Sequence, residues 1–294
     1  MIQLAKKIVR SSLHAFGFEI SRYRKGPTFR ELYPNCRHDN GFVYDVCDQL
    51  MYQNVTDLID YSGASWEGLT RDPHGETAFI VNEIKQGNTV IDIGANIGFY
   101  TLLLAKLVGP HGAVIAFEPG PVSFSLLKVN TILNGIKNVT LLNKSVTASS
   151  GIEYYYSNQT AESGSTTTRT TPEFGHPRER IEVEAVSLDD YFRDNDTKID
   201  YIKMDVEGGE YNALKGMQNL LAQNPGIRLT IEYAPYLPLW GGVELQEFLD
   251  FIRAQDFKIY DLTLSSHGPV SDQYLLETYP KHQVGKYANL LLKR

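Results

Sequence analysis

The chain has 294 residues, 42% of them apolar, and a formal net charge of −7. This length and apolar content suit one full domain with a substantial core, and the negative charge gives no sign of a protein that coats nucleic acid. Two cysteines are too few for a disulfide framework, and no apolar run approaches the roughly 18 residues of a membrane span. We therefore expect a cytoplasmic protein without a nucleic-acid partner.

Residues 1–30 form a basic segment, with seven lysines and arginines against a single glutamate. On a helical wheel, apolar residues such as Leu4 and Ile8 fill one half and Lys6 and Arg10 lie on the other, which predicts a basic amphipathic helix. Such a helix can lie on the inner face of an anionic membrane through residues 1–25, or dock on its own domain or on a second subunit of a homo-oligomer. Both interpretations stay open.

Residues 31–75 have mixed patterning, and we expect an irregular cap there. From residue 76 to residue 294, strand and helix patterns alternate. The patterns predict strands at Val90–Ile93, Ala113–Phe117, Val139–Leu142, Ile199–Met204, Ile227–Ile231, Lys258–Leu262 and Leu290–Leu292, and helices at Phe99–Val108, Val122–Leu133, Glu210–Gln223 and Leu245–Gln255. Such alternation indicates an α/β domain with a mostly parallel sheet and helices on both faces.

The stretch "VIDIGANIGFY", residues 90–100, joins the first predicted strand to a helix. Ligands of such sheets bind at the carboxyl ends of the strands, so we expect Asp92, Gly94, Asn96 and Gly98 to lie at a ligand. A phosphate-binding P-loop would need a lysine where Phe99 stands, and a dinucleotide fingerprint would have glycine where Asn96 stands. The loop is therefore better suited to a ligand with a carboxylate and an amine than to a diphosphate.

Glu118 ends the second predicted strand, at the spacing expected of a carboxylate that binds a ribose diol. A ribose and an amino acid without a pyrophosphate describe S-adenosylmethionine. An NAD(P)-dependent enzyme that uses Glu118 for its ribose, and a non-catalytic nucleoside-binding protein, remain as alternatives.

Four stretches in order, "IDIGANIGFYT", "AFEPGP", "VSLDDYF" and "YIKMDVEGGEYNALKG", resemble the FkbM-type methyltransferase family. The resemblance runs from about residue 75 to the terminal "NLLLKR" and implies a Rossmann-like, class I, S-adenosylmethionine-dependent methyltransferase with a seven-stranded sheet. The cofactor site that it implies comprises Glu76, Asp92, Gly94, Ala95, Asn96, Gly98, Phe99, Glu118, Lys144 and Ser145. In that site, Lys144 and Ser145 would line the adenine. The family mostly methylates hydroxyl groups, so we expect an O-methyltransferase of a sugar, glycan or glycolipid-type acceptor.

The segment "KMDVEGGE" places Asp205, Glu207 and Glu210 within six residues, where three carboxylates would repel one another unless they bind a cation or a proton. Asp205 and Glu207 are candidates for binding or deprotonating the acceptor, and Glu232 for completing the pocket or pairing with Arg228 or Lys203. Deprotonation needs a general base or a divalent cation. The sequence leaves open which applies, and a metal at Asp205 and Glu207 would be Mg²⁺ or Mn²⁺.

Residues 157–180 are rich in Ser and Thr and lie between two strand-like runs, Ile152–Tyr156 and Ile181–Val186. They are expected to form a mobile surface loop or a lid over the substrate. In the lid interpretation Arg169, His176, Arg178 and Arg180 would contact an anionic or polyhydroxylated acceptor.

Overall fold

The computed structural model describes residues 41–46, 49–54, 75–158, 161–165, 179–237, 243–264 and 268–294. The helix expected over residues 1–30 lies outside this described part of the chain, as do Arg169, His176 and Arg178. Within the described part, no helix has the length and apolar content needed to cross a membrane.

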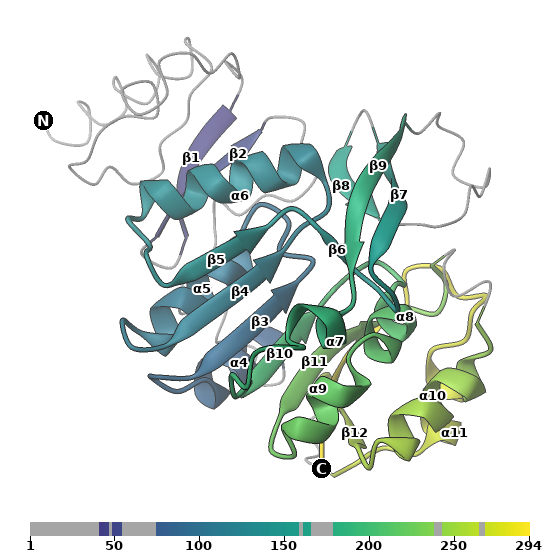
Figure 1. The fold of residues 1–294 in the computed structure, drawn as a ribbon. Helices are drawn as coiled ribbons and strands as arrows, with labels where there is room; N and C mark the ends of the chain where they lie inside the picture. The colour runs from purple at the N-terminus through teal and green to yellow at the C-terminus, as the bar shows by residue number, and fades with distance from the viewer. Residues whose placement is uncertain are drawn as a thin grey trace, which may run out of the picture.

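Seven strands form the main sheet, in the order β12-β13-β11-β10-β3-β4-β5 (Figure 1). They are β3 (Thr89–Ile93), β4 (Ala113–Phe117), β5 (Val139–Leu142), β10 (Tyr201–Met204), β11 (Arg228–Tyr233), β12 (Lys258–Asp261) and β13 (Ala288–Lys293). Of the seven strands in this sheet, β13 alone runs in the direction opposite to the other six. Every predicted strand is present within two residues of its expected bounds, and the expected α/β fold is confirmed.

The order of the strands reverses between β3 and β10. From β3 the chain adds β4 and β5 on one side, and it later returns to place β10 and β11 on the other. The chain therefore continues from β3 and from β10 toward opposite faces of the sheet. Open α/β sheets bind their ligands at the carboxyl ends of the strands, at the point where the strand order reverses in this way.

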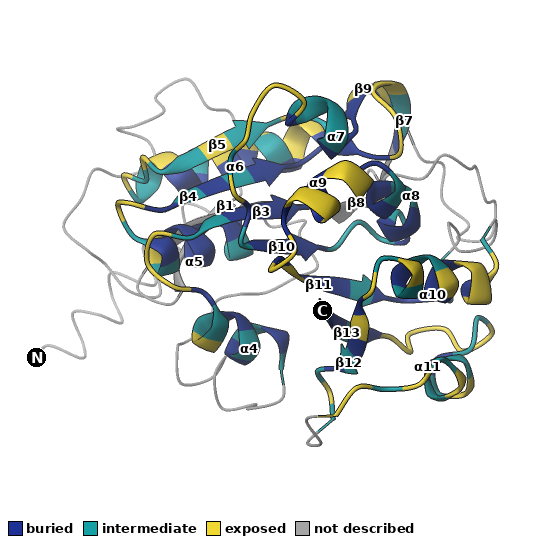
Figure 2. Ribbon diagram, turned by 60° about the horizontal axis from the view of Figure 1, so that its bottom comes forward, coloured by how far each residue is buried: buried dark blue, intermediate teal, exposed yellow. Residues whose placement is uncertain are grey.

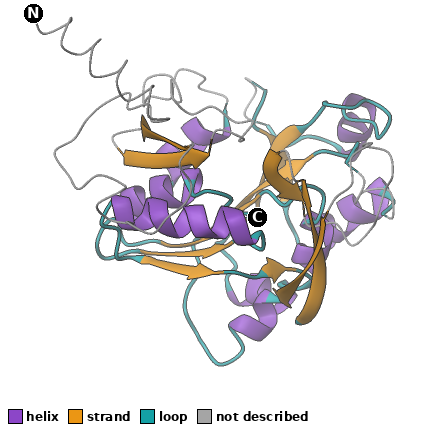
Figure 3. Ribbon diagram, turned by 90° about the horizontal axis from the view of Figure 1, so that it is seen from above, coloured by secondary structure: helices purple, strands orange, loops and turns teal. Residues whose placement is uncertain are grey.

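Helices cover both faces of the main sheet (Figure 3). One face packs against α4 (Glu76–Glu83), α5 (Phe99–Val108) and α6 (Pro121–Leu133), and the other against α7 (Leu188–Tyr191), α8 (Glu210–Lys215), α9 (Gln218–Gln223), α10 (Leu245–Ala254) and α11 (Asp272–Thr278). Successive strand residues explain this division, because Val90 packs with α4 and α5 while Ile91 joins the opposite cluster. Figure 2 shows the central strands buried between these layers.

The single helix predicted over Glu210–Gln223 is wrong, because the structure divides it into α8 and α9 at Gly216. A Cβ atom on Gly216 would lie 2.0 Å from the carbonyl oxygen of Thr147, so only glycine allows this close approach. The Gly216 carbonyl in turn accepts a hydrogen bond of 2.8 Å from the backbone N–H of Asp189. Contacts with a distant segment thus interrupt a helix that local periodicity would continue.

The "VSLDDYF" stretch caps two helices. The Ser187 hydroxyl accepts the N–H of Asp190 at the start of α7. The Asp189 carboxylate accepts the N–H groups of Asn219 and Leu220, at 3.1 and 2.9 Å, in the first turn of α9. These bonds satisfy N–H groups that the helices leave unpaired at their amino ends. The motif therefore has a structural role on the face opposite α4 and α5.

A second sheet interrupts the alternation between β5 and β10. Its strands are β6 (Ser145–Val146), β7 (Gly151–Asn158), β8 (Ala161–Ser165) and β9 (Glu179–Val186), in the order β6-β9-β7-β8. Figure 1 shows it past the arrowheads of β4 and β5. The loop expected over residues 157–180 thus contains β8 and the ends of β7 and β9, which corrects that prediction.

The region expected to be an irregular cap, residues 31–75, contains a hairpin. Strands β1 (Gly41–Val46) and β2 (Gln49–Asn54) pair antiparallel along their whole length. The expectation of irregular structure is therefore wrong for residues 41–46 and 49–54.

Replacing Asp189 by alanine should lower the free energy of unfolding by about 1–2 kcal/mol, since the first turn of α9 loses its side-chain cap. Urea unfolding measures this change, with the exposed Asp194→Ala as the matched control. Equal stability of Asp189→Ala and Asp194→Ala would show that the two hydrogen bonds to α9 contribute nothing measurable.

Candidate active site

The loop between β3 and α5 is held against two other elements. The N–H groups of Gly94 and Ala95 both donate to the carbonyl of Phe117 at 3.0 Å. Gly94 has a φ of +81°, and a Cβ there would lie 1.8 Å from the carbonyl oxygen of Asp205. Gly98 has a φ of +104°, and its Cβ would lie 2.7 Å from Leu127 of α6. The protein's own packing thus also requires glycine at position 94, and the positive φ at Gly98 favours glycine there.

Asp92 lies near the carboxyl end of β3, and its side chain is fully buried. One carboxylate oxygen accepts the hydroxyl of Thr101 in α5 at 2.6 Å, and the other has no hydrogen-bond partner among the described residues. Burial raises the pKa of Asp92, while the ammonium of Lys203 and the Thr101 hydroxyl lower it. Asp92 therefore joins the end of β3 to the first turn of α5.

Glu118 joins the β3 loop to the loop after β4. One carboxylate oxygen accepts the N–H of Asn96 at 2.8 Å and the other accepts the N–H of Gly120 at 2.7 Å. Burial raises the pKa of Glu118 to about 7, although these two hydrogen bonds favour the ionised form. Each carboxylate oxygen has a second lone pair, so the group can still accept hydrogen bonds from a ligand.

Asn143 and Gly120, which the sequence interpretation missed, support the corner where Glu118 joins the β3 loop to the loop after β4. The Asn143 amide donates to the carbonyls of Glu118 and Pro119, at 2.8 and 3.0 Å. A Cβ on Gly120 would lie 2.8 Å from both the Glu118 carboxylate and the Tyr155 hydroxyl, so the second sheet reaches this corner through β7. The glycine in "FEPGP" was the sequence signal for this close contact. Gly120 has an ordinary φ of −64°, so glycine is needed there for lack of space and not for its backbone conformation.

The other expected cofactor residues lie on several elements. Phe99 begins α5, and its ring makes an edge contact with Tyr100. Lys144 forms an ion pair of 2.6 Å with Glu184 of β9. The Ser145 hydroxyl donates to Glu153 of β7 at 3.1 Å. Lys144 and Ser145 thus connect the end of β5 to the second sheet, while their assignment to the adenine stays a prediction.

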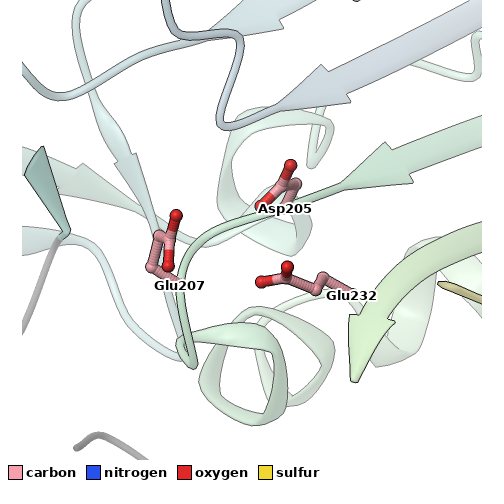
Figure 4. A group of neighbouring side chains, drawn as sticks. All are labelled: Asp205, Glu207 and Glu232. Atoms are coloured by element: carbon pink, nitrogen blue, oxygen red, sulfur yellow. The ribbon is translucent and has the colours of Figure 1, made fainter. Parts of the chain in front are cut away.

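A cluster of three carboxylates lies at the carboxyl ends of β10 and β11. Figure 4 shows Asp205, Glu207 and Glu232 with their carboxylates turned toward a common space. One oxygen from each lies within 4.8 Å of the others, a spacing that a metal ion could bridge. Glu207 adopts a φ of +55°, which is uncommon for a side-chain-bearing residue and is associated with functional sites. The structure thus brings together the three predicted catalytic residues.

Glu232 lies in a buried and acidic environment. Burial, followed by the neighbouring carboxylates of Asp205, Glu207 and Glu210, raises its pKa to about 10 against the lowering effect of Lys203. One Glu232 oxygen is buried without a hydrogen-bond partner among the described residues. In the ligand-free protein, burial and the neighbouring carboxylates therefore favour the protonated form of Glu232. A cation placed among the carboxylates would favour the ionised form instead.

Glu210 belongs to helix structure, as expected of an acid in the first turn. It is fully buried, and one oxygen accepts the N–H of Val206 at 3.0 Å. Burial raises its pKa to about 8, while backbone N–H groups oppose the rise. The Glu210 carboxylate therefore folds back over the turn that carries Glu207.

Lys203 is buried on β10 beside the candidate site, with 2% of its surface exposed. Its ammonium lies 3.1 Å from an Asp205 oxygen and 4.5 Å from the centre of the Tyr100 ring. Glu76, at the start of α4, is also buried, and its pKa is raised by burial and lowered by Lys203. Because Arg228 pairs with Glu83, neither basic partner suggested for Glu232 makes an ion pair with it among the described residues.

The family model described as "Methyltransferase FkbM domain" matches residues 92–259, more than half of the chain. The chain belongs to the FkbM methyltransferase family. It is 26% identical over 220 residues to the 31-O-demethyl-FK506 methyltransferase FkbM of Streptomyces tacrolimicus, covering 64% of this chain and 81% of that protein. It is 28% identical over 205 residues to methyltransferase sdnD of Sordaria araneosa, covering 56% and 76%.

Among solved structures, the chain is similar to the methyltransferase FkbM of Methylobacillus flagellatus KT, with a TM-score of 0.43 and 18% identity over 70% of this chain and 43% of that one. FkbM membership makes the protein an S-adenosylmethionine-dependent methyltransferase. The predicted family and cofactor are therefore confirmed, whereas the acceptor, the atom methylated and the metal remain predictions.

Gly94→Ala should destabilise this FkbM protein by at least about 2 kcal/mol more than Gly87→Ala. Both glycines have a positive φ, but a Cβ on Gly87 meets nothing within 4 Å, whereas a Cβ on Gly94 collides with the Asp205 carbonyl. The difference in unfolding free energy isolates the contact from the conformational cost, which is about 1–2 kcal/mol at either position. Equal losses would contradict the close approach of β3 and β10.

Proposed function

We propose that this protein is an O-methyltransferase that transfers the methyl group of S-adenosylmethionine to a hydroxyl of a small sugar, glycan or glycolipid-type acceptor. The observation that carries the proposal is the cluster of Asp205, Glu207 and Glu232 directly beside the loop after β3, with the Asp205 carbonyl against Gly94. The name of the Streptomyces relative, a 31-O-demethyl-FK506 methyltransferase, refers to methylation of an oxygen, which supports the same chemistry.

In this proposal the cofactor occupies the carboxyl edge of β3 and β4. The loop from Gly94 to Gly98 binds the methionine end, where the amino end of α5 favours its carboxylate. Glu118 accepts hydrogen bonds from the ribose hydroxyls. Ala95, Asn96 and Phe99 complete the binding loop, Asp92 and Glu76 support it from the interior, and Lys144 and Ser145 lie toward the adenine.

The carboxylate cluster binds the acceptor. A carbon–sulfur bond breaks and a carbon–oxygen bond forms, so the acceptor oxygen must lie about 3 Å from the methyl group and lose its proton. Asp205, whose carboxylate lies 3.1 Å from the Lys203 ammonium, is the residue placed to take that proton. Protonated Glu232 donates a hydrogen bond, and Glu207 orients the acceptor. Mg²⁺ or Mn²⁺ held by these all-oxygen ligands is the alternative way to acidify the hydroxyl.

Two tyrosines extend the acceptor side of the cluster. The pKa of Tyr236 is raised by burial and by the neighbouring Glu232 and Glu207 carboxylates, and Tyr287 also acts on it. Tyr287 is half exposed, at 50%. Tyrosines combine an apolar ring with a hydroxyl, a pairing suited to a sugar ring. The absence of a nucleic-acid partner, a homo-oligomer, a cytoplasmic location and membrane contact through residues 1–25 remain predictions.

Glu118→Ala should weaken binding of S-adenosylhomocysteine by about 1.5–3 kcal/mol, the contribution of hydrogen bonds to a charged group. In the unmodified protein the affinity should fall as the pH drops below about 7, because protonation of Glu118 removes an acceptor for the ribose. Titration calorimetry measures both effects, with the exposed Glu182→Ala as control. An unchanged affinity for Glu118→Ala would remove Glu118 from the site.

Asp205→Asn and Glu207→Gln should each lower turnover a hundredfold or more and leave the affinity for S-adenosylhomocysteine within a few-fold. Turnover is followed as the transfer of one labelled methyl group to glycan and lipid extracts of cells that lack this gene, with Glu182→Gln as control. Activity that returns to chelator-treated protein only with Mg²⁺ or Mn²⁺ would establish the metal alternative. Full activity of both variants would contradict the proposed roles of Asp205 and Glu207 in binding and deprotonating the acceptor.

A further inference from the structure

Lys203 is a buried cation between the two halves of the candidate site. It pairs in register with Asp92 of β3, and its ammonium contacts the Asp205 carboxylate at 3.1 Å. Lys203 and Asp205 lie two residues apart, so both side chains project to the same face of β10. The ammonium therefore contacts Asp205, the proposed acceptor residue, from the strand position next to Asp92 of the candidate cofactor loop.

The surroundings of Lys203 are strongly acidic. The carboxyl groups of Asp205, Asp92 and Glu76 all act on its ammonium electrostatically, and the 3.1 Å ion pair with Asp205 compensates its charge in the interior. Glu232 also interacts with Lys203 electrostatically. Few long side chains carry a charge in a protein interior without such compensation. Without the ammonium, these carboxyl groups would lose the buried positive charge that acts on them.

The substrate and product forms of the cofactor differ in charge at this location. S-adenosylmethionine carries a positive sulfonium, and S-adenosylhomocysteine carries a neutral thioether. An uncompensated carboxylate beside the sulfonium would stabilise the cofactor before transfer more than the transition state, in which that charge is dispersing. Such ground-state stabilisation does not accelerate the chemical step.

We propose that Lys203 is a positioning residue that pairs with Asp205 and sets the charge balance of the site, so that the site does not favour the sulfonium cofactor over its thioether product. This inference rests on the proposed placement of the cofactor beside Asp205. It assigns to the lysine of "YIKMDVEGGE" a role in discriminating the two cofactor forms by charge, in addition to any packing role.

The test is the ratio of the dissociation constant of S-adenosylhomocysteine to that of S-adenosylmethionine, measured by titration calorimetry. Wild-type protein should bind the thioether at least as tightly as the sulfonium. Lys203→Met should raise the ratio about fivefold or more, the order expected from removing a unit charge about 10 Å away at an effective dielectric of about 20 to 40. Lys203→Arg, which keeps the charge, should restore a ratio close to that of wild type.

The exposed Lys198, which forms an ion pair with Asp200, gives the matched control Lys198→Met, with no change in the ratio expected. A purely structural role for Lys203 would weaken both ligands together, and an unchanged ratio in Lys203→Met would overturn the inference. If that variant does not fold, wild-type protein that binds S-adenosylmethionine more than tenfold tighter than S-adenosylhomocysteine overturns it as well. Failure of wild type to bind either ligand would instead reject the proposed cofactor site.

Discussion

The close approach of the ends of β3 and β10 determines the geometry of the site. The backbone of Gly94 lies so near the Asp205 carbonyl that no side chain fits between them. The Asp205 N–H also donates to the carbonyl of Ile93 at 3.0 Å, which extends the pairing of the two strands beyond the last ladder residues. Because these loops leave from the point where the strand order reverses, the cofactor loop and the carboxylate cluster become neighbours. A donor and an acceptor bound there would lie side by side, as methyl transfer requires.

Burial sets the electrostatics on both sides of this contact. Asp92, Glu118 and Glu232 are acids with a raised pKa, and burial is the largest cause for each. Lys203 supplies the compensating charge for part of this group. The Glu118 carboxylate is satisfied by backbone N–H groups, whereas Glu232 retains a buried oxygen without a partner among the described residues. The candidate cofactor side is therefore largely preorganised, and the proposed acceptor side is the part that a ligand, a proton or a cation would complete.

The second sheet adds a wall that the basic α/β fold lacks. It begins at Ser145, two residues after Asn143, whose amide holds the backbone at Glu118, and β7 brings Tyr155 to the space beside Gly120. The same insertion reaches the opposite side of the fold, where the Thr147 carbonyl packs against Gly216 and divides α8 from α9. One inserted segment thus contacts both the candidate cofactor corner and the helical layer behind the carboxylate cluster.

The sequence alone determined the α/β fold, its seven main strands, the family and the groups of residues at the strand ends, because these depend on local periodicity and on short motifs. It also named Asp205, Glu207 and Glu232, since carboxylates that end neighbouring parallel strands meet at one edge. Only the tertiary structure decided the break at Gly216, the strands within residues 157–180, the support from Asn143 and the burial of Lys203 against Asp205. Each depends on contacts between segments far apart in the chain, whose distances no local pattern records.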